Sequence, residues 1–188
     1  MTEILLFHHA LGQTQGFLEF ADQWRAAGHT VHAPDLYDGA TFGTVDEGVA
    51  HAESIGFDEI VRRGAAVAAT LPSRIVYAGF SLGAMPAQSL TQTRPGALGA
   101  LLLYGAVPTA SFPSPWPPAT PMQMHAMASD EWAEVPVLEE LAREISGAEL
   151  FLYPGSGHLF ADASSDDYDE QATALLMKRT LEFLERVS

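Results

Sequence analysis

The sequence has no cysteine and few basic residues, with 9 Lys and Arg against 24 Asp and Glu. The absence of cysteine excludes disulfides, thiolate metal sites and a cysteine nucleophile. The formal charge of −15 at pH 7 repels phosphate backbones and anionic lipid head groups. Neither nucleic acid nor a membrane surface is therefore expected as a partner.

Long apolar runs are also missing, because no segment reaches the ~18 apolar residues of a membrane span. The first residues, Met1 to Glu3, lack the basic start of a secretory signal, so a cytoplasmic protein is the default expectation. What the chain does have is a hydrophobic content of 47% over 188 residues, which predicts a single globular domain spanning residues 1–188.

Short apolar segments alternate with segments of helical length, which predicts an α/β fold. This pattern is typical of a doubly wound, mostly parallel sheet flanked by helices, in which ligands bind at the carboxyl ends of the strands. The predicted strands are residues 4–9, 30–36, 74–80, 99–107, 122–128 and 149–153. The predicted helices are residues 15–27, 57–71, 82–92, 135–145 and 168–187.

Two further segments are interpreted as structural. The run "SSDDYDE", residues 164–170, offers capping residues and carboxylates for the start of the last helix, and no site is expected on it. The proline-rich stretch 108–121 cannot continue a helix or a central strand, so it predicts an ordered loop that packs Trp116 over the sheet edge.

A serine stands between two glycines in "VYAGFSLGA", where a predicted strand meets a predicted helix. The pattern G-x-S-x-G in this context indicates a nucleophile elbow, a strained turn that exposes the serine hydroxyl. Ser81 is therefore the candidate nucleophile, although the pattern by itself is weak.

A serine hydroxyl needs a base to remove its proton, and the base needs an acid to orient it. Among the seven histidines, His158 in "YPGSGHLF" follows the last predicted strand and lies among small residues. Asp130 is the first carboxylate after the preceding predicted strand, with Glu131 and Glu134 as alternatives close behind. Ser81, Asp130 and His158 follow the chain order of α/β-hydrolase triads.

Catalysis on an ester also needs amide donors for the oxyanion. The amide after the nucleophile, that of Leu82, is expected to supply one. The loop after the first strand, "FHHALG", should supply the other from Ala10, with Leu11 in reserve.

Four segments together resemble the dienelactone hydrolase family of α/β-hydrolases: "FHHALGQTQGF", "AAGHTVHAPDLYDG", "VYAGFSLGA" and "YPGSGHLF". The resemblance implies a compact fold without a large lid domain, no cofactor, and the triad and oxyanion amides named above. The chain departs from the type enzyme of the family, which has cysteine in place of Ser81 and a glutamate in place of His9. Ester hydrolysis therefore carries over, but activity on a dienelactone does not.

The pair His8-His9 is predicted to shape the pocket rather than to bind metal, because neighbouring residues on a strand point to opposite faces. His9 is expected to face Ser81 across the site, with Leu11 and Tyr37 as further pocket residues.

The sequence thus predicts a carboxylic ester hydrolase without a metal or cofactor, acting on a small ester or lactone through an acyl-enzyme. An acyltransferase or C–C bond hydrolase using the same triad, or a non-catalytic binding protein of the same fold, remain alternatives. The oligomeric state is left open. None of the nine basic residues falls on a predicted loop at the carboxyl ends of the strands, which favours an uncharged substrate.

Overall fold

Six short strands form one sheet, in the order β2-β1-β3-β4-β5-β6, and every neighbouring pair is parallel. The computed structural model describes residues 1–188. It confirms the predicted doubly wound parallel sheet. The strands are β1 (Glu3–Phe7), β2 (Thr30–His32), β3 (Val76–Phe80), β4 (Gly99–Leu103), β5 (Met122–Met127) and β6 (Glu149–Tyr153).

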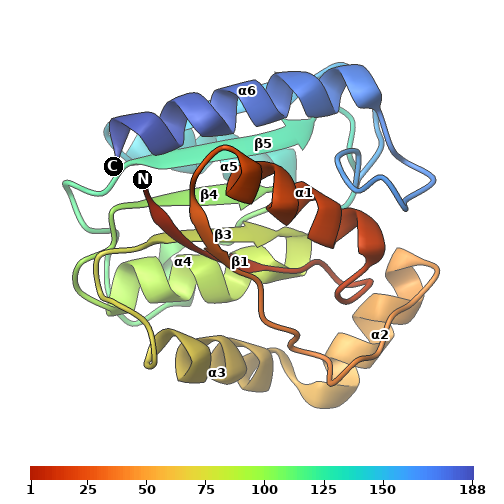
Figure 1. Cartoon of the computed structure of the whole chain (residues 1–188), viewed down its shortest axis with the longest axis horizontal. Coiled ribbons are helices and arrows are strands. Elements are labelled where there is room, and N and C mark those ends of the chain that lie inside the picture. Colours follow the sequence, from red (N-terminus) through yellow and green to blue (C-terminus); the bar gives the residue numbers. More distant parts are fainter.

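Six α-helices cover the two faces of this sheet. Helices α1 and α6 lie over one face, while α3 and α4 lie over the other (Figure 1). None of the helices is both long and apolar enough to cross a membrane. The helices are α1 (Gln15–Ala26), α2 (Val45–Ile55), α3 (Phe57–Ala68), α4 (Ala84–Thr93), α5 (Val135–Glu144) and α6 (Glu170–Arg186).

The apolar core is divided by the sheet into two layers. One layer packs β-strand side chains such as Phe7 and Leu102 against α3, α4 and α5. The other packs side chains such as Leu6 and Leu103 against α1 and α6, around Trp24 and Phe183. Strands β3 and β4 are buried along their whole length, which explains why their sequences read as continuous apolar runs.

The predicted strands extend past the observed carboxyl ends at four places, in β5 by the single residue Ala128. β2 ends at His32 instead of Leu36, and Pro34, which has no N–H, follows within two residues. β4 ends at Leu103 because Tyr104 adopts φ +69° and turns the chain. The first strand likewise ends at Phe7, before His9. The residues beyond these ends are still largely buried, so hydrophobicity alone did not mark the strand ends.

Helix α2 was not predicted, although its start carries a sequence signal. Thr44 accepts a hydrogen bond from the amide of Glu47, and the Glu47 carboxylate accepts one from the amide of Thr44. This capping box, T-x-x-E, is a recognised helix start. The capping box is therefore the local signal that indicates this helix.

The two segments interpreted as structural behave differently from each other. The proline-rich stretch is an ordered loop, and Trp116 is buried within it, donating from Nε1 to the carbonyl of Thr120. Asp169 caps α6 by accepting from the amide of Ala172, as expected for the acidic run. The first half of that run, however, forms turns that border the candidate site described next.

Candidate active site

Ser81 lies on a sharp turn between β3 and α4. Its φ of +51° is a conformation that non-glycine residues rarely adopt, and a short 3₁₀ turn, Ser81–Gly83, leads into α4. Gly83 packs so closely against the end of β1 that a Cβ there would overlap the carbonyl groups of Phe7 and His8. The elbow predicted from G-x-S-x-G is therefore present, with its serine at the carboxyl end of a central strand.

The structure brings Ser81, His158 and Asp130 together. Ser81 Oγ lies 2.7 Å from His158 Nε2, and His158 Nδ1 lies 2.7 Å from Asp130 Oδ2. The residues come from the loops after β3, β6 and β5. The other carboxylate oxygen of Asp130 accepts from the amide of Trp132 at 2.9 Å. Glu131 and Glu134, the alternative acids, are exposed and form no hydrogen bond with His158.

His158 is held from its backbone as well as from its ring. Its amide donates to Asp167 Oδ2 at 3.0 Å, and its ring lies 6.0 Å from that of Tyr104. Asp167 belongs to the acidic run on which no site was expected. This hydrogen bond ties the turns before α6 to the loop that carries His158.

The two expected oxyanion amides come from different segments of the chain. Leu82 follows Ser81 directly, and the Ala10 amide lies in the loop after β1, where no acceptor of the chain takes its N–H. The reserve donor, the amide of Leu11, is already committed, because it donates to His9 Nδ1 at 3.2 Å. Of the two candidates in this loop, Ala10 is the one with a free donor.

His9 takes part in a second histidine–aspartate pair that the sequence did not reveal. His9 Nε2 lies 2.6 Å from Asp162 Oδ2, and both side chains are fully buried. Asp162 also accepts from the Thr14 hydroxyl, the Ser164 hydroxyl and the Ser164 amide. Burial alone would raise the pKa of Asp162, but the hydrogen bonds from His9, Ser164 and Thr14 lower it to about 2.

The two histidines of the His8-His9 pair have separate partners. His8 donates from Nδ1 to the carbonyl of His9 and accepts at Nε2 from the amide of Leu36. Burial lowers the pKa of His8 to about 4, so its ring is neutral at pH 7. Tyr37 is buried against this ring, with the two ring centroids 4.8 Å apart.

Three cavities surround the candidate triad. A cavity of about 160 Å³ is lined by Ser81 and Leu82, and one of about 310 Å³ by His158 and Asp167. The third, of about 490 Å³, lies between the starts of α1 and α2 and is lined by Leu11 and Asp167 among others. Of the three expected pocket residues, Leu11 lines the largest cavity, whereas His9 and Tyr37 line none of the three.

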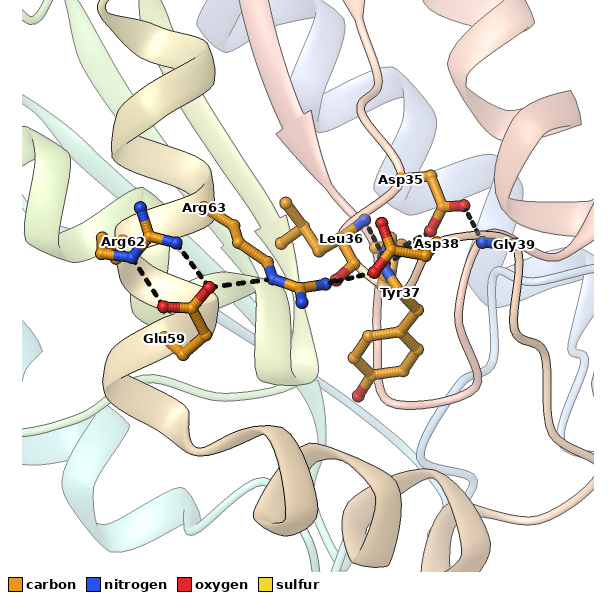
Figure 2. Close-up of polar contacts among 9 residues, drawn as sticks. Asp35, Leu36, Tyr37, Asp38, Gly39, Glu59, Arg62 and Arg63 are labelled. Carbon is orange, nitrogen blue, oxygen red and sulfur yellow. Dashed lines mark hydrogen bonds and ion pairs between the residues drawn. The ribbon is translucent and has the colours of Figure 1, made fainter.

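Basic side chains lie away from these cavities. None of the three is lined by Lys or Arg. Arg63 of α3 does reach the loop after β2, where it donates to the carbonyl of Leu36 and to Asp38 (Figure 2). It is also bonded to Glu59, whose pKa is lowered to about 2, first by the hydrogen bond from Arg62 and then by Arg63. The Leu36 carbonyl, Asp38 and Glu59 thus accept hydrogen bonds from Arg63.

Comparison with known proteins agrees with this architecture. The family model described as the dienelactone hydrolase family matches residues 1–188. A comparison with curated protein sequences found no match.

Among solved structures, a candidate dienelactone hydrolase from Klebsiella pneumoniae superposes with a TM-score of 0.80 at 17% identity, covering 98% of this chain and 87% of the other. A dienelactone hydrolase-like promiscuous phosphotriesterase from metagenomic libraries gives 0.75 at 13% identity, with 100% and 87% covered. A metagenome-derived lipolytic enzyme gives 0.66 at 17% identity, with 98% and 94% covered. The fold is that of the α/β-hydrolases, and the chain belongs to the dienelactone hydrolase family.

Proposed function

We propose that the protein is a serine hydrolase that cleaves a small carboxylic ester or lactone through an acyl-enzyme. The observation that carries the proposal is the continuous chain of hydrogen bonds from Ser81 Oγ through His158 to Asp130, with 2.7 Å at each step. Membership of a hydrolase family over the whole chain supports it. A general base must have an acceptor atom within hydrogen-bond reach of the serine hydroxyl, and His158 Nε2 meets this requirement.

In the proposed reaction, His158 Nε2 takes the proton from Ser81 Oγ as the oxygen attacks the ester carbonyl. Asp130 holds the imidazole by its Nδ1–H and stabilises the imidazolium that forms. The amides of Leu82 and Ala10 donate to the oxyanion of the tetrahedral intermediate. His158 then protonates the leaving oxygen, and water hydrolyses the acyl-enzyme by the same steps in reverse order.

The turn at Ser81 is part of this proposal. A serine held at φ +51° costs on the order of 1–3 kcal/mol, which the surrounding structure must offset. In this conformation the Ser81 hydroxyl lies 2.7 Å from His158 Nε2, as the proposed reaction requires.

A fluorophosphonate probe, which reacts with activated serines, tests the proposal directly. The wild-type protein should be labelled at Ser81 and should hydrolyse short-chain esters, while Ser81→Ala should lose labelling and roughly 10³-fold or more of kcat. Circular dichroism should show that Ser81→Ala keeps its fold, because the side chain lies in the site and not in the core. Unchanged hydrolysis in Ser81→Ala would place the nucleophile elsewhere.

A further inference from the structure

Two of the cavities meet at the candidate triad and share Trp132. The smaller is lined by Ser81, Leu82 and Trp132, but not by His158. The larger is lined by His158 and Trp132, but not by Ser81. Trp132 is 46% exposed, unusually so for a large aromatic residue, and its ring lies 6.3 Å from that of His158. Its side chain therefore stands between two separate spaces that open on the same reacting atoms.

The proposed chemistry assigns a different half of the substrate to each space. The acyl carbon bonds to Ser81 Oγ and its oxygen faces the Leu82 amide, so the acyl group must extend into the space lined by these two residues. The leaving oxygen receives its proton from His158 Nε2, so the alcohol half must extend over the histidine. The smaller cavity is thus the acyl side, and the larger cavity is the alcohol side.

The acyl side is small, and 8 of its 11 lining residues are hydrophobic. Besides Ser81 and Leu82, its lining includes the side chains of Met85, Val107 and Ala133. Its volume is about 160 Å³, and an apolar cavity of about 150 Å³ holds one benzene molecule. An acyl chain of about six carbon atoms therefore fills it.

Backbone strain is concentrated around this same cavity. Four non-glycine residues of the chain have φ values between +48° and +69°. Three of the four, Ser81, Tyr104 and Glu134, line the acyl side. Such strain persists only where the surrounding structure enforces it, and it tends to gather at functional sites. This observation is independent of the triad distances and identifies the small cavity as part of the working site.

The alcohol side is larger and polar. Its volume is about 310 Å³, and Trp132 is its one apolar lining residue. The remaining lining residues beside His158 carry hydroxyl groups or carboxylates: Ser129, Glu131, Ser156 and Asp167. These side chains are exposed, and they supply donors and acceptors for the hydroxyl groups of an alcohol.

We propose that the substrate is the ester of a short apolar carboxylic acid, of up to about six carbon atoms, with a polar hydroxyl-bearing alcohol. The proposal rests on the serine hydrolase function given above and adds the identity of the two halves. In the acylation step the Ser81 Oγ–acyl bond forms and the ester C–O bond breaks, and the serine proton passes through His158 to the alcohol oxygen. In the second step a water oxygen bonds to the acyl carbon, the acid leaves, and the water proton returns to Ser81 Oγ.

The first arm of the test varies the acyl half. Esters of one alcohol with acyl chains of two to ten carbons should show kcat/KM falling at least tenfold beyond about six carbons. Met85→Ala should move this fall to longer chains, and Val107→Phe should move it to shorter ones. Met177→Ala, which removes the same atoms from a half-buried position on α6, should keep the wild-type profile. Equal turnover of four- and ten-carbon acyl chains by the wild type would overturn the proposal.

The second arm varies the alcohol half with butyrate as the fixed acid. The glyceryl ester should be turned over with at least tenfold higher kcat/KM than the hexyl ester, and a preference for hexyl would contradict the polar alcohol side. Fluorophosphonate labelling distinguishes a failure of this substrate proposal from a failure of the proposed serine hydrolase function. Loss of the chain-length profile with labelling intact overturns this proposal alone, whereas absence of labelling and of all ester hydrolysis overturns the proposed function itself.

Discussion

The protein contains two buried histidine–aspartate pairs whose geometries are nearly the same, and their difference lies at the second ring nitrogen. His158 and Asp130 are 2.7 Å apart, and His9 and Asp162 are 2.6 Å apart. All four side chains are at most 3% exposed. The free nitrogen of His158 faces Ser81 Oγ, whereas that of His9 accepts from the Leu11 amide.

That difference decides what each pair can do. His9 Nδ1 already accepts a backbone proton, so its Nε2 must carry the ring hydrogen and donate it to Asp162. This histidine has no free lone pair with which to take a proton from a substrate. Burial and an aspartate partner are therefore insufficient to identify a base, and the group on the far side of the ring is the informative contact.

Replacing each of the two aspartates by asparagine should give the largest difference in activity between the two pairs. Asp130→Asn should lower kcat roughly 10⁴-fold, because the amide no longer fixes the tautomer of His158 or stabilises its imidazolium. Asp162→Asn should lower kcat less than about tenfold, since it acts only through the loop that carries Ala10. Steady-state kinetics on a short-chain ester measures both.

Glu131→Gln and Glu134→Gln are the controls for Asp130→Asn, and both should cost far less activity. A larger loss in either glutamate variant would move the role of orienting acid to that residue. Equal losses in Asp130→Asn and Asp162→Asn would remove the distinction between the two pairs.

Acid stability extends the comparison to the neighbour of His9. Burial lowers the pKa of His8 to about 4, from an ordinary value of 6.5. Above pH 6.5 the ring is mostly neutral in both the folded and the unfolded protein. As the pH falls toward 4, the ring takes up a proton in the unfolded chain but not in the folded chain. We expect His8 alone to lower the free energy of unfolding by about 2 kcal/mol between pH 7 and pH 4.5, measured by urea denaturation.

His125 provides an internal check on this prediction. Burial, followed by the charge of Arg179, lowers the pKa of His125 to about 3, so it contributes in the same direction over the same window. His125→Phe should therefore show a shallower dependence of stability on pH than the wild type. A wild-type stability that stays constant from pH 7 to pH 4.5 would contradict the neutral, buried state of both rings.

At neutral pH the two aspartate substitutions should rank in one order by their effect on stability and in the opposite order by their effect on activity. Asp162→Asn removes a charged acceptor of four hydrogen bonds, and we expect it to cost about 2 kcal/mol of unfolding free energy. Asp130→Asn should lower the unfolding free energy by less, because Asp130 accepts fewer hydrogen bonds from the protein. Urea midpoints at pH 7 give both values, and the reverse ranking would mean that Asp162 is not the structural partner.

The smallest expected effect concerns substrate charge. No Lys or Arg lines the cavities, and the nearest histidine pair has no nitrogen free for a carboxylate. Neutral esters should thus have about tenfold higher kcat/KM than matched esters that carry a free carboxylate. Measuring both series at low and high salt isolates the contribution of the −15 net charge. A consistent preference for the carboxylate series would show that His9 or another group binds anions.

The sequence predicted those parts of the fold and site that depend on local pattern. Strand β6 was predicted with the observed bounds, and the strand and helix around Ser81 were predicted from the alternation of short apolar segments with segments of helical length. The ends of β2 and β4 were overestimated because Leu36 and Tyr104 are buried outside the strands. Local hydrophobicity reports burial and does not distinguish a strand from the buried turn that follows it.

The contacts of His9 could not be predicted in the same way. Its partner Asp162 lies 153 residues away, and the amide that occupies its other nitrogen is set by the turn of the loop after β1. Strand alternation could not place His9 relative to Ser81, because β1 ends at Phe7 and the loop that follows sets the direction of the His9 side chain. Helix α2 differs from His9 in this respect, because its T-x-x-E start is a local sequence signal for a helix.

The network around Asp162 also has a consequence for how the protein folds. It joins His9 and Thr14 to a residue about 150 positions later, so the loop after the first strand acquires its native contacts only after most of the chain has been synthesised. Contacts of such sequence separation carry a large loop-closure cost and slow the folding of parallel sheets. The Ala10 loop is therefore expected to become ordered late, together with the segment that carries His158, so that the nucleophile elbow forms before the groups that act on it.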